Sequence, residues 1–130
     1  MNESMNQELK VTLEDYLRAF ESKDFEAVAE CYHSPCMFIS PFGVRAVTDI
    51  ASARKLASQL IEQAVGQGYK RTETFELEVQ SITAGLASMK GIFSRRDSND
   101  TEIMRFGFCY TLLQVDGRWR IVVAIAHGVD

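Results

Sequence analysis

The longest apolar run of the chain lies between residues 102 and 128, on both sides of an Asp116-Gly117 dipeptide. Asp-Gly favours a two-residue type I′ turn, because both central positions of that turn need a positive φ angle. The segment therefore predicts a long β-hairpin in which Phe106 pairs with His127, and directly paired residues share one face of a sheet. The predicted bulky face carries Phe106, Phe108, Tyr110, Leu112, Trp119, Ile121, Val123, Ile125 and His127.

The opposite face of this hairpin is small but also largely apolar. It carries Gly107, Cys109, Thr111, Leu113, Val122, Ala124 and Ala126. A strand pair that is apolar on both faces has to be covered on both. If helices cover only one face, the other remains an exposed apolar surface, which usually marks an interface. We therefore expect a homodimer formed through the outer face of the sheet.

Three amphipathic helices are predicted earlier in the chain. The first runs from about Leu9 to Lys23, with apolar residues at three- and four-residue steps, and residues 1–6 before it are polar and expected to be frayed. Asp24 is a good N-cap for a short second helix, whose C-terminal end would hold His33. The third helix covers residues 49–65.

Strands are predicted between and after these helices. Residues 36–40 form a short strand that ends at a proline-glycine turn, and residues 71–81 alternate with Phe75, Leu77 and Val79 directed inward. Residues 86–95 are the hairpin partner of that second strand. Helices early and long strands late in the chain predict an α+β domain.

Length and charge narrow the possible functions. The 130 residues, 46% of them hydrophobic, predict one domain with its own core. A net charge of -4 and a pI near 5.2 argue against nucleic acid as the main partner, since phosphate binding needs a basic surface. No run reaches membrane-spanning length, and the first residues lack the charge and apolar order of a signal peptide. We expect no membrane partner and, by default, a cytoplasmic location.

The three cysteines are an odd number, which predicts reduced thiols rather than a disulfide framework. Cys31, His33 and Cys36 are close in sequence and raise the question of a metal site. Their spacing matches no usual zinc pattern and a fourth ligand is not evident. We therefore expect no metal and no cofactor, with the cysteines filling core positions.

The segment DYLRAFESKDFEAVAECYHSPCMFISPFG, residues 15–43, resembles the opening of the NTF2-like superfamily, also called SnoaL-like, which includes ketosteroid isomerases and polyketide cyclases. The DGRWRI sequence of the last hairpin extends the resemblance over nearly the whole chain. The resemblance implies an NTF2-like cone, in which three N-terminal helices pack on a strongly curved, mainly antiparallel sheet. It also implies an apolar pocket between the sheet and the first helix, where such proteins bind small molecules.

The isomerase site of this superfamily has a tyrosine on the first helix, an aspartate base just before a proline, and a second acid on the penultimate strand. Tyr16 matches the tyrosine, but Ser40, before Pro41, stands where the aspartate would be. The second acid would fall around residues 108–110, where there is no carboxylate. A serine hydroxyl does not accept a proton at neutral pH without an activating partner. The resemblance therefore implies that isomerase chemistry by this route is absent.

His127 is the most suggestive candidate, because imidazole exchanges protons near neutral pH; a hydrogen-bonded core or rim histidine is the structural alternative. Arg71 or Arg105 near the rim is a further candidate, for an anionic ligand group.

Two functions remain open: a small-molecule binding protein or enzyme that uses the pocket, and a non-catalytic dimeric interaction or scaffold module whose pocket is filled by side chains. The ligand-pocket candidates are Tyr16, Phe38, Ser40, Phe106, Phe108, Tyr110, Val123, Ile125 and His127.

Overall fold

The computed structural model of the chain describes residues 2–129, in which six strands form one sheet and three helices precede or interrupt its strands. The elements are α1 (Asn2–Glu21), α2 (Phe25–Glu30), β1 (Tyr32–Ser40), β2 (Gly43–Val47), α3 (Ile50–Gly66), β3 (Arg71–Thr83), β4 (Leu86–Arg96), β5 (Glu102–Val115) and β6 (Arg118–His127). The strand order is β2-β1-β6-β5-β4-β3, with β1 and β6 parallel and all other neighbours antiparallel.

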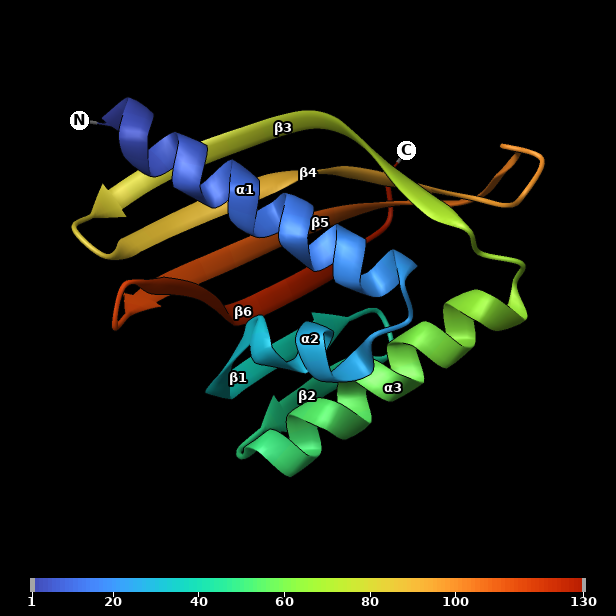
Figure 1. Ribbon diagram of the computed structural model, residues 1–130, viewed down its shortest axis with the longest axis horizontal. Helices are drawn as coiled ribbons and strands as arrows, with labels where there is room; N and C mark the ends of the chain where they lie inside the picture. Colours follow the sequence, from blue (N-terminus) through green and yellow to red (C-terminus); the bar gives the residue numbers. More distant parts are fainter. Residues whose placement is uncertain (1, 130) are drawn as a thin grey trace.

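The helices all lie on one face of the curved sheet (Figure 1). α1 crosses in front of the long strands β3, β4 and β5, whereas α2 and α3 pack together beside β1 and β2. The α+β architecture with a mainly antiparallel sheet is therefore confirmed. Within the described residues no helix combines the length and the hydropathy that a membrane span requires.

Local signals explain where the helices start. The Asp24 carboxylate accepts a hydrogen bond from the Ala27 N–H at 3.1 Å, and the Asp49 carboxylate accepts one from the Ser52 N–H at 2.8 Å. The Ser52 side chain in turn accepts from the Asp49 N–H, which completes a capping box. α1 begins earlier than the apolar stripe indicates, so residues 2–6, which we expected to be frayed, are helical.

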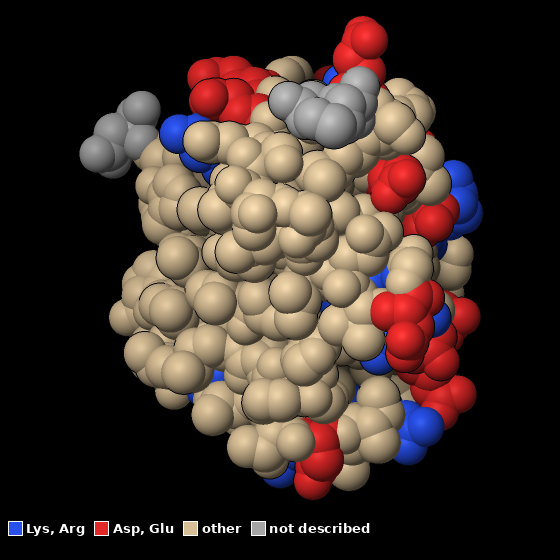
Figure 2. Space-filling view, turned by 90° about the vertical axis from the view of Figure 1, so that its left-hand side faces the viewer, with Lys and Arg blue, Asp and Glu red and all other residues tan. Residues whose placement is uncertain are grey.

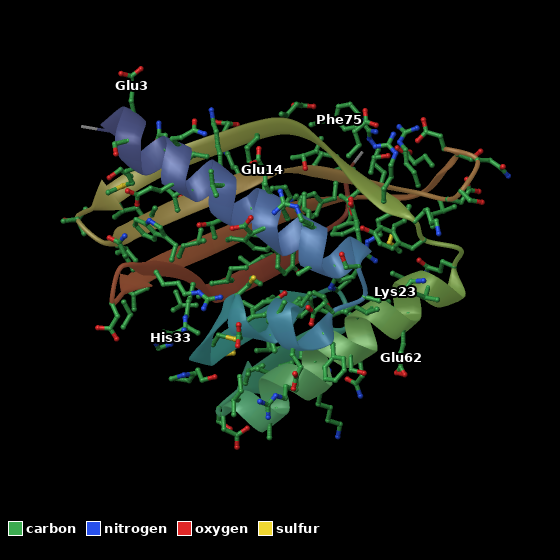
Figure 3. The ribbon with its side chains drawn as sticks, in the orientation of Figure 1. Glu3, Glu14, Lys23, His33, Glu62 and Phe75 are labelled. Carbon is green, nitrogen blue, oxygen red and sulfur yellow. The ribbon has the colours of Figure 1, made fainter. Side chains whose placement is uncertain are left out.

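The short second helix ends sooner than predicted. It stops at Glu30, and β1 begins at Tyr32 because that residue already pairs with Ile121 of β6. His33 is therefore a strand residue and not a helix cap; its Nδ1 lies 2.9 Å from the Pro35 carbonyl oxygen. Figure 3 shows it at the start of β1.

The β5–β6 hairpin has the predicted turn but not the predicted register throughout. Asp116 and Gly117 both have positive φ angles, 54° and 77°, as a type I′ turn requires. Leu112 pairs with Ile121 as expected, yet the next pair is Thr111 with Val123. Val122 is thus an extra residue, a β-bulge that sends every later side chain of β6 to the face opposite the predicted one.

This bulge corrects the predicted bulky face. Val123, Ile125 and His127 pair with Thr111, Cys109 and Gly107 on the outer face of the sheet. Ala124 and Ala126 pair with Tyr110 and Phe108 and so face the helices. Burial along β6 agrees, since Trp119 and Ile121 are buried before the bulge and Ala124 after it.

A second bulge corrects β3. Phe75 pairs with Ile92 and Glu78 with Lys90, so two residues of β3 oppose the single residue between those β4 partners. Glu76, inside this bulge, has a φ of 54°. Phe75, which we expected to point inward, consequently lies on the outer face, where Arg105 is 5.0 Å from its ring centre; Figure 3 shows it at the β3 edge.

Candidate functional site

The space between α1 and the concave face of the sheet is closed at one end by a tyrosine cluster, which we call the closed end. The Tyr16 hydroxyl lies 2.8 Å from the Tyr32 hydroxyl, and the Tyr16 ring meets the rings of Tyr32 and Tyr110 edge to face. Burial raises the pKa of Tyr16, and raises the pKa of Tyr32 and of Tyr110 well above the ordinary value. These phenols therefore stay protonated and act as neutral hydrogen-bond donors or acceptors.

Beyond the tyrosines the concave face is largely filled. Phe93 stacks on Phe108 with ring centres 3.9 Å apart, and Phe106 meets Phe93 edge to face. The inner chamber left among these side chains measures about 40 Å³, enough for a few water molecules. A ligand body of drug-like size cannot enter it without moving these rings.

A larger hollow opens from this chamber to solvent, and we call it the mouth. Its volume is about 280 Å³, close to the lower end of the range for small-molecule sites. Its walls come from the end of β1 and the turn that follows, from α3, from β4 and β5, and from the end of β6. The side chains and backbone that line it belong to Phe38, Ser40, Pro41, Phe42, Leu60, Gln63, Arg95, Met104, Arg105, Phe106, Ala126, His127 and Gly128.

Arg95 stands at the junction of the mouth and the inner chamber and lines both. Its guanidinium carbon lies 4.9 Å from the centre of the Phe106 ring, 5.1 Å from that of Phe20 and 5.7 Å from that of Tyr69. Strand pairing explains this position, because Arg95 is two residues after Phe93 and therefore shares its face. Three aromatic rings thus hold one cation inside the cone.

No carboxylate offsets this cation directly. Within residues 2–129 no ion pair or hydrogen bond joins the Arg95 side chain to another residue, and neither chamber has Asp or Glu in its lining. Glu21 carries the nearby negative charge, but its Oε2 accepts a hydrogen bond from the Thr72 N–H at 3.0 Å. The site therefore combines apolar walls, neutral phenols and, besides the paired Arg105, one positive charge without a bonded partner in residues 2–129.

Six of the nine predicted pocket residues lie on the concave side. Phe38 pairs with Ala124 and so faces the helices, and Ser40, two residues later, lies at the rim of the mouth. The concave group is Tyr16, Phe38, Ser40, Phe106, Phe108 and Tyr110. The structure brings Phe106, Phe108 and Tyr110 together with Tyr16 but leaves Ser40 at the opening of the mouth.

The other three candidates, Val123, Ile125 and His127, belong to the outer face, although Ile125 still borders the inner chamber from its strand. A Cβ atom at Gly107 would overlap the His127 ring, which shows that the imidazole lies over that glycine on the outer face. His127 reaches the rim of the mouth from there, and its Nδ1 lies 2.9 Å from the Gly128 carbonyl oxygen. His127 and Tyr16 therefore do not share a cavity, contrary to the predicted register, because the bulge at Val122 separates them.

The remaining candidates have structural contacts. The Ser40 hydroxyl oxygen accepts a hydrogen bond from the Phe42 N–H at 3.2 Å. Arg71 pairs with Glu73 and Asp100 outside the mouth. Arg105 lies at the rim, where its Nη1 donates to Glu102 at 3.0 Å.

The cysteines do not gather at one site. Cys36 is buried, and burial raises the pKa of its thiol to about 11. Cys31 and Cys109 are half-buried, and burial likewise raises the pKa of Cys31 to about 11. The Cys31 and Cys36 thiols are therefore protonated at neutral pH and poorly nucleophilic.

Sequence reasoning missed Arg95, Leu60 and Phe42 as parts of the site. The signal for Arg95 was the alternation Met89, Gly91, Phe93, Arg95, which puts a charge on an apolar strand face. For Phe42, 95% exposed in the β1–β2 turn, the sequence offers only an aromatic residue between Pro41 and Gly43.

Comparison with known proteins identifies the fold independently. The family model described as "NTF2-like protein (DUF6841)" matches residues 7–129. No curated protein matches the chain.

Several solved structures are similar over nearly the whole chain. An NTF-2-like protein of unknown function from Shewanella oneidensis MR-1 is 15% identical, with a TM-score of 0.75 over 94% of this chain and 98% of its own. The protein Aln2 from a Streptomyces species is 14% identical, with a TM-score of 0.79 over 96% and 91%. An NTF2-like protein with a cystatin-like fold from Novosphingobium aromaticivorans is 16% identical, with a TM-score of 0.77 over 96% and 82%. At these identities the likeness concerns the fold alone.

Proposed function

Because the chain belongs to the NTF2-like family, whose model spans residues 7–129, we propose that it binds a small, largely apolar molecule in the mouth of the cone. The observation that carries this proposal is a solvent-open hollow of about 280 Å³ that continues inward to a wall of aromatic rings. Concave, mostly apolar hollows with a few placed polar groups are typical small-molecule sites.

The walls of the mouth support this proposal. Phe38 from β1, Leu60 from α3 and Phe106 from β5 supply apolar surface from three elements. Each square ångström of apolar surface that a ligand covers there contributes roughly 25 cal/mol to binding, before the cost of association. The polar side chains of the lining, which would orient a ligand, are Ser40, Gln63, Arg95, Arg105 and His127.

The proposal is for binding without isomerase-type acid and base chemistry. Ser40 stands where a carboxylate base would be and its oxygen already accepts the Phe42 N–H. His127 approaches the rim from the outer face. Neither group is placed beside the protonated phenols of the closed end, so proton transfer across one bound molecule has no matched pair of groups.

A neutral fluorophore tests the proposal. N-phenyl-1-naphthylamine, excited where tryptophan does not absorb, should gain emission on binding to the wild-type protein. Ala126→Trp places an indole into the mouth and should abolish the gain, whereas Ala84→Trp, the same change at the exposed β3–β4 turn, should not. Leu60→Trp is a second filling variant that approaches the mouth from α3.

Two outcomes would reject the proposal. Absence of any emission gain with the wild-type protein would mean that the mouth takes no small apolar molecule. An equal gain with wild-type, Ala126→Trp and Leu60→Trp proteins would place the fluorophore elsewhere. Melting curves of each variant show whether a lost signal reflects lost folding.

We further propose that the outer face of the sheet pairs with a second copy of the chain. Met37, Ile39, Val123 and Ile125 form an apolar group there that no helix covers. Figure 2, which views the end opposite the mouth, shows charged side chains gathered at the top, the helix side and the lower edge. The ion pairs of the outer face, such as Lys90 with Glu78 and Arg105 with Glu102, lie on β3, β4 and β5, whereas this apolar group lies on β1 and β6. Uncovered apolar faces of this kind favour self-association. A scaffold role would use the same face.

Sedimentation velocity at micromolar concentration tests the dimer. The mass obtained for the wild-type protein should be twice the chain mass of 14.7 kDa, and the mass of Ile125→Glu should be that of the monomer. Val11→Glu places the same charge on an exposed apolar position of α1 and should leave the dimer intact. A wild-type monomer would contradict the proposal.

A further inference from the structure

We infer that the ligand of the mouth is an aromatic or alicyclic monocarboxylate whose single negative charge is held by Arg95. This inference rests on the binding site proposed above and adds the chemical class of the ligand. Arg95 lies on the concave side among aromatic rings, whereas Glu73, Asp100 and Glu102 pair with other arginines.

The arginines that neighbour Arg95, unlike Arg95 itself, are paired with carboxylates. On the outer face and at the β4–β5 turn, Arg71 pairs with Asp100, Arg96 with Glu73, and Arg105 with Glu102. The acids that take part in this network are Glu73, Asp100 and Glu102. Strand alternation directs Arg95 to the other face, so the network offers it no partner.

The rings around Arg95 leave its hydrogen-bond donors unused. Phe20, Tyr69 and Phe106 approach within 5.7 Å of the guanidinium carbon and attract it through their faces. A guanidinium carries five N–H donors in a planar fork, and none of them bonds to another residue in the described part of the chain. Two parallel donors of this fork match the two oxygens of a carboxylate.

The surroundings favour one negative charge over two. Phe20 is the penultimate residue of α1, so Arg95 lies beside the C-terminal end of that helix, where the backbone carbonyls carry partial negative charge. The Glu21 carboxylate bonds to the N–H of Thr72, which is the cross-strand partner of Arg95. A phosphate dianion would meet both repulsions with one guanidinium to offset them.

Cavity size sets the orientation of the ligand. The inner chamber holds about 40 Å³, so the body of the ligand has to extend outward into the mouth, past Phe38 and Leu60. The carboxylate therefore lies innermost and the apolar body outermost. The body of the ligand would then lie between Phe106 of β5 and Leu60 of α3, and longer ligands would extend toward Phe42.

The test compares three molecules that share one ring system. 2-Naphthoate carries one negative charge, 2-naphthamide is its neutral isostere, and 2-naphthyl phosphate carries up to two charges. Affinities for the wild-type protein are measured by isothermal titration at low salt. 2-Naphthoate should bind at least tenfold more tightly than either of the others, and the preference over the amide should fall as salt is added.

Three variants assign the preference to Arg95. Arg95→Met should bind the amide and the acid alike, and Arg95→Lys should keep part of the preference, because a lysine retains the charge but not the fork. Arg118→Met removes a cation that pairs with Glu30 at the start of β6, outside the lining of the mouth, and should keep the full preference. Binding of the amide by Arg95→Met shows that this variant is folded and its mouth intact.

The outcomes separate this inference from the proposed function. Equal binding of acid and amide by the wild-type protein would overturn the inference and leave the binding site standing. Tighter binding of the phosphate would overturn the single-charge requirement. Retention of the full preference by Arg95→Met, or its loss in Arg118→Met, would overturn the assignment to Arg95. If no naphthalene compound binds and N-phenyl-1-naphthylamine also fails, the proposed function falls with the inference.

Discussion

The closed end and the mouth of the cone are built from the same strands but differ in how their polar groups are satisfied. At the closed end Tyr16 and Tyr32 bond to each other, and the Trp119 indole N–H donates to Glu8 at 3.1 Å. At the mouth the Arg95 guanidinium has rings around it and no bonded partner within the described chain. The first arrangement is complete without a ligand, and the second is not.

Burial follows the same division. Leu112 at the closed end is 1% exposed, whereas Phe42 at the mouth is 95% exposed. Closed packing with paired hydroxyls stabilises the fold, whereas an exposed aromatic side chain contributes little to stability. We therefore expect substitutions at the closed end to act on unfolding and substitutions at the mouth to act on binding.

The largest effect is expected from Leu112→Ala. It removes a fully buried side chain from the closed end and should lower the free energy of unfolding by about 2 to 5 kcal/mol, since surrounding side chains fill such a cavity only in part. Urea unfolding followed by circular dichroism measures the change. Ile82→Ala, at a side chain 53% exposed, is the control and should cost far less. Equal losses would mean that the closed end is not well packed.

Tyr16→Phe comes next. It leaves the Tyr32 hydroxyl without its partner in a buried site, which should cost about 1 to 3 kcal/mol of stability. The double variant Tyr16→Phe, Tyr32→Phe removes both hydroxyls, so it should lose clearly less than the sum of the two single variants. Additive losses in urea unfolding would show that the two hydroxyls do not depend on each other.

Gly117→Val tests the turn at the closed end. A β-branched residue resists the φ of 77° found there, so we expect a loss of about 1 to 2 kcal/mol in the free energy of unfolding. Gly128→Val is the matched control near the mouth, where the glycine has no positive φ and open space around it. If thermal melting gives Gly117→Val and Gly128→Val the same melting temperature, the positive φ angle at Gly117 is not important for the stability of the hairpin.

The smallest effect is expected from Phe42→Ser. The side chain lines the mouth but is almost fully exposed, so stability should change by less than about 0.5 kcal/mol. Affinity for N-phenyl-1-naphthylamine should fall by a few-fold, because one apolar wall is lost. A variant that binds as well as wild type would show that the ligand does not extend to the β1–β2 turn.

The sequence by itself determined the local elements and the order in which they occur. Helix starts follow from Asp24 and Asp49, whose side chains bond the first backbone N–H groups, and the Asp116-Gly117 turn follows from its need for positive φ angles. These signals act within a few residues, so no distant contact is needed to read them. The resemblance of residues 15–43 to NTF2-like proteins rested on the order of such elements, and the family model that matches residues 7–129 confirms it.

Only the tertiary structure decided which side chains face the interior. A strand read as an uninterrupted alternation puts His127 inside, but one extra residue at Val122 moves it to the outer face. A bulge leaves one residue unpaired and bends its strand, and this one is defined by the pairing of β6 with β5, not by the sequence of β6 alone. Arg95 shows the converse. Strand alternation places it on the same face as Phe93, and this can be read from the sequence. The rings of Phe20 and Tyr69, which lie 75 and 26 residues before it, come next to it only when the chain folds.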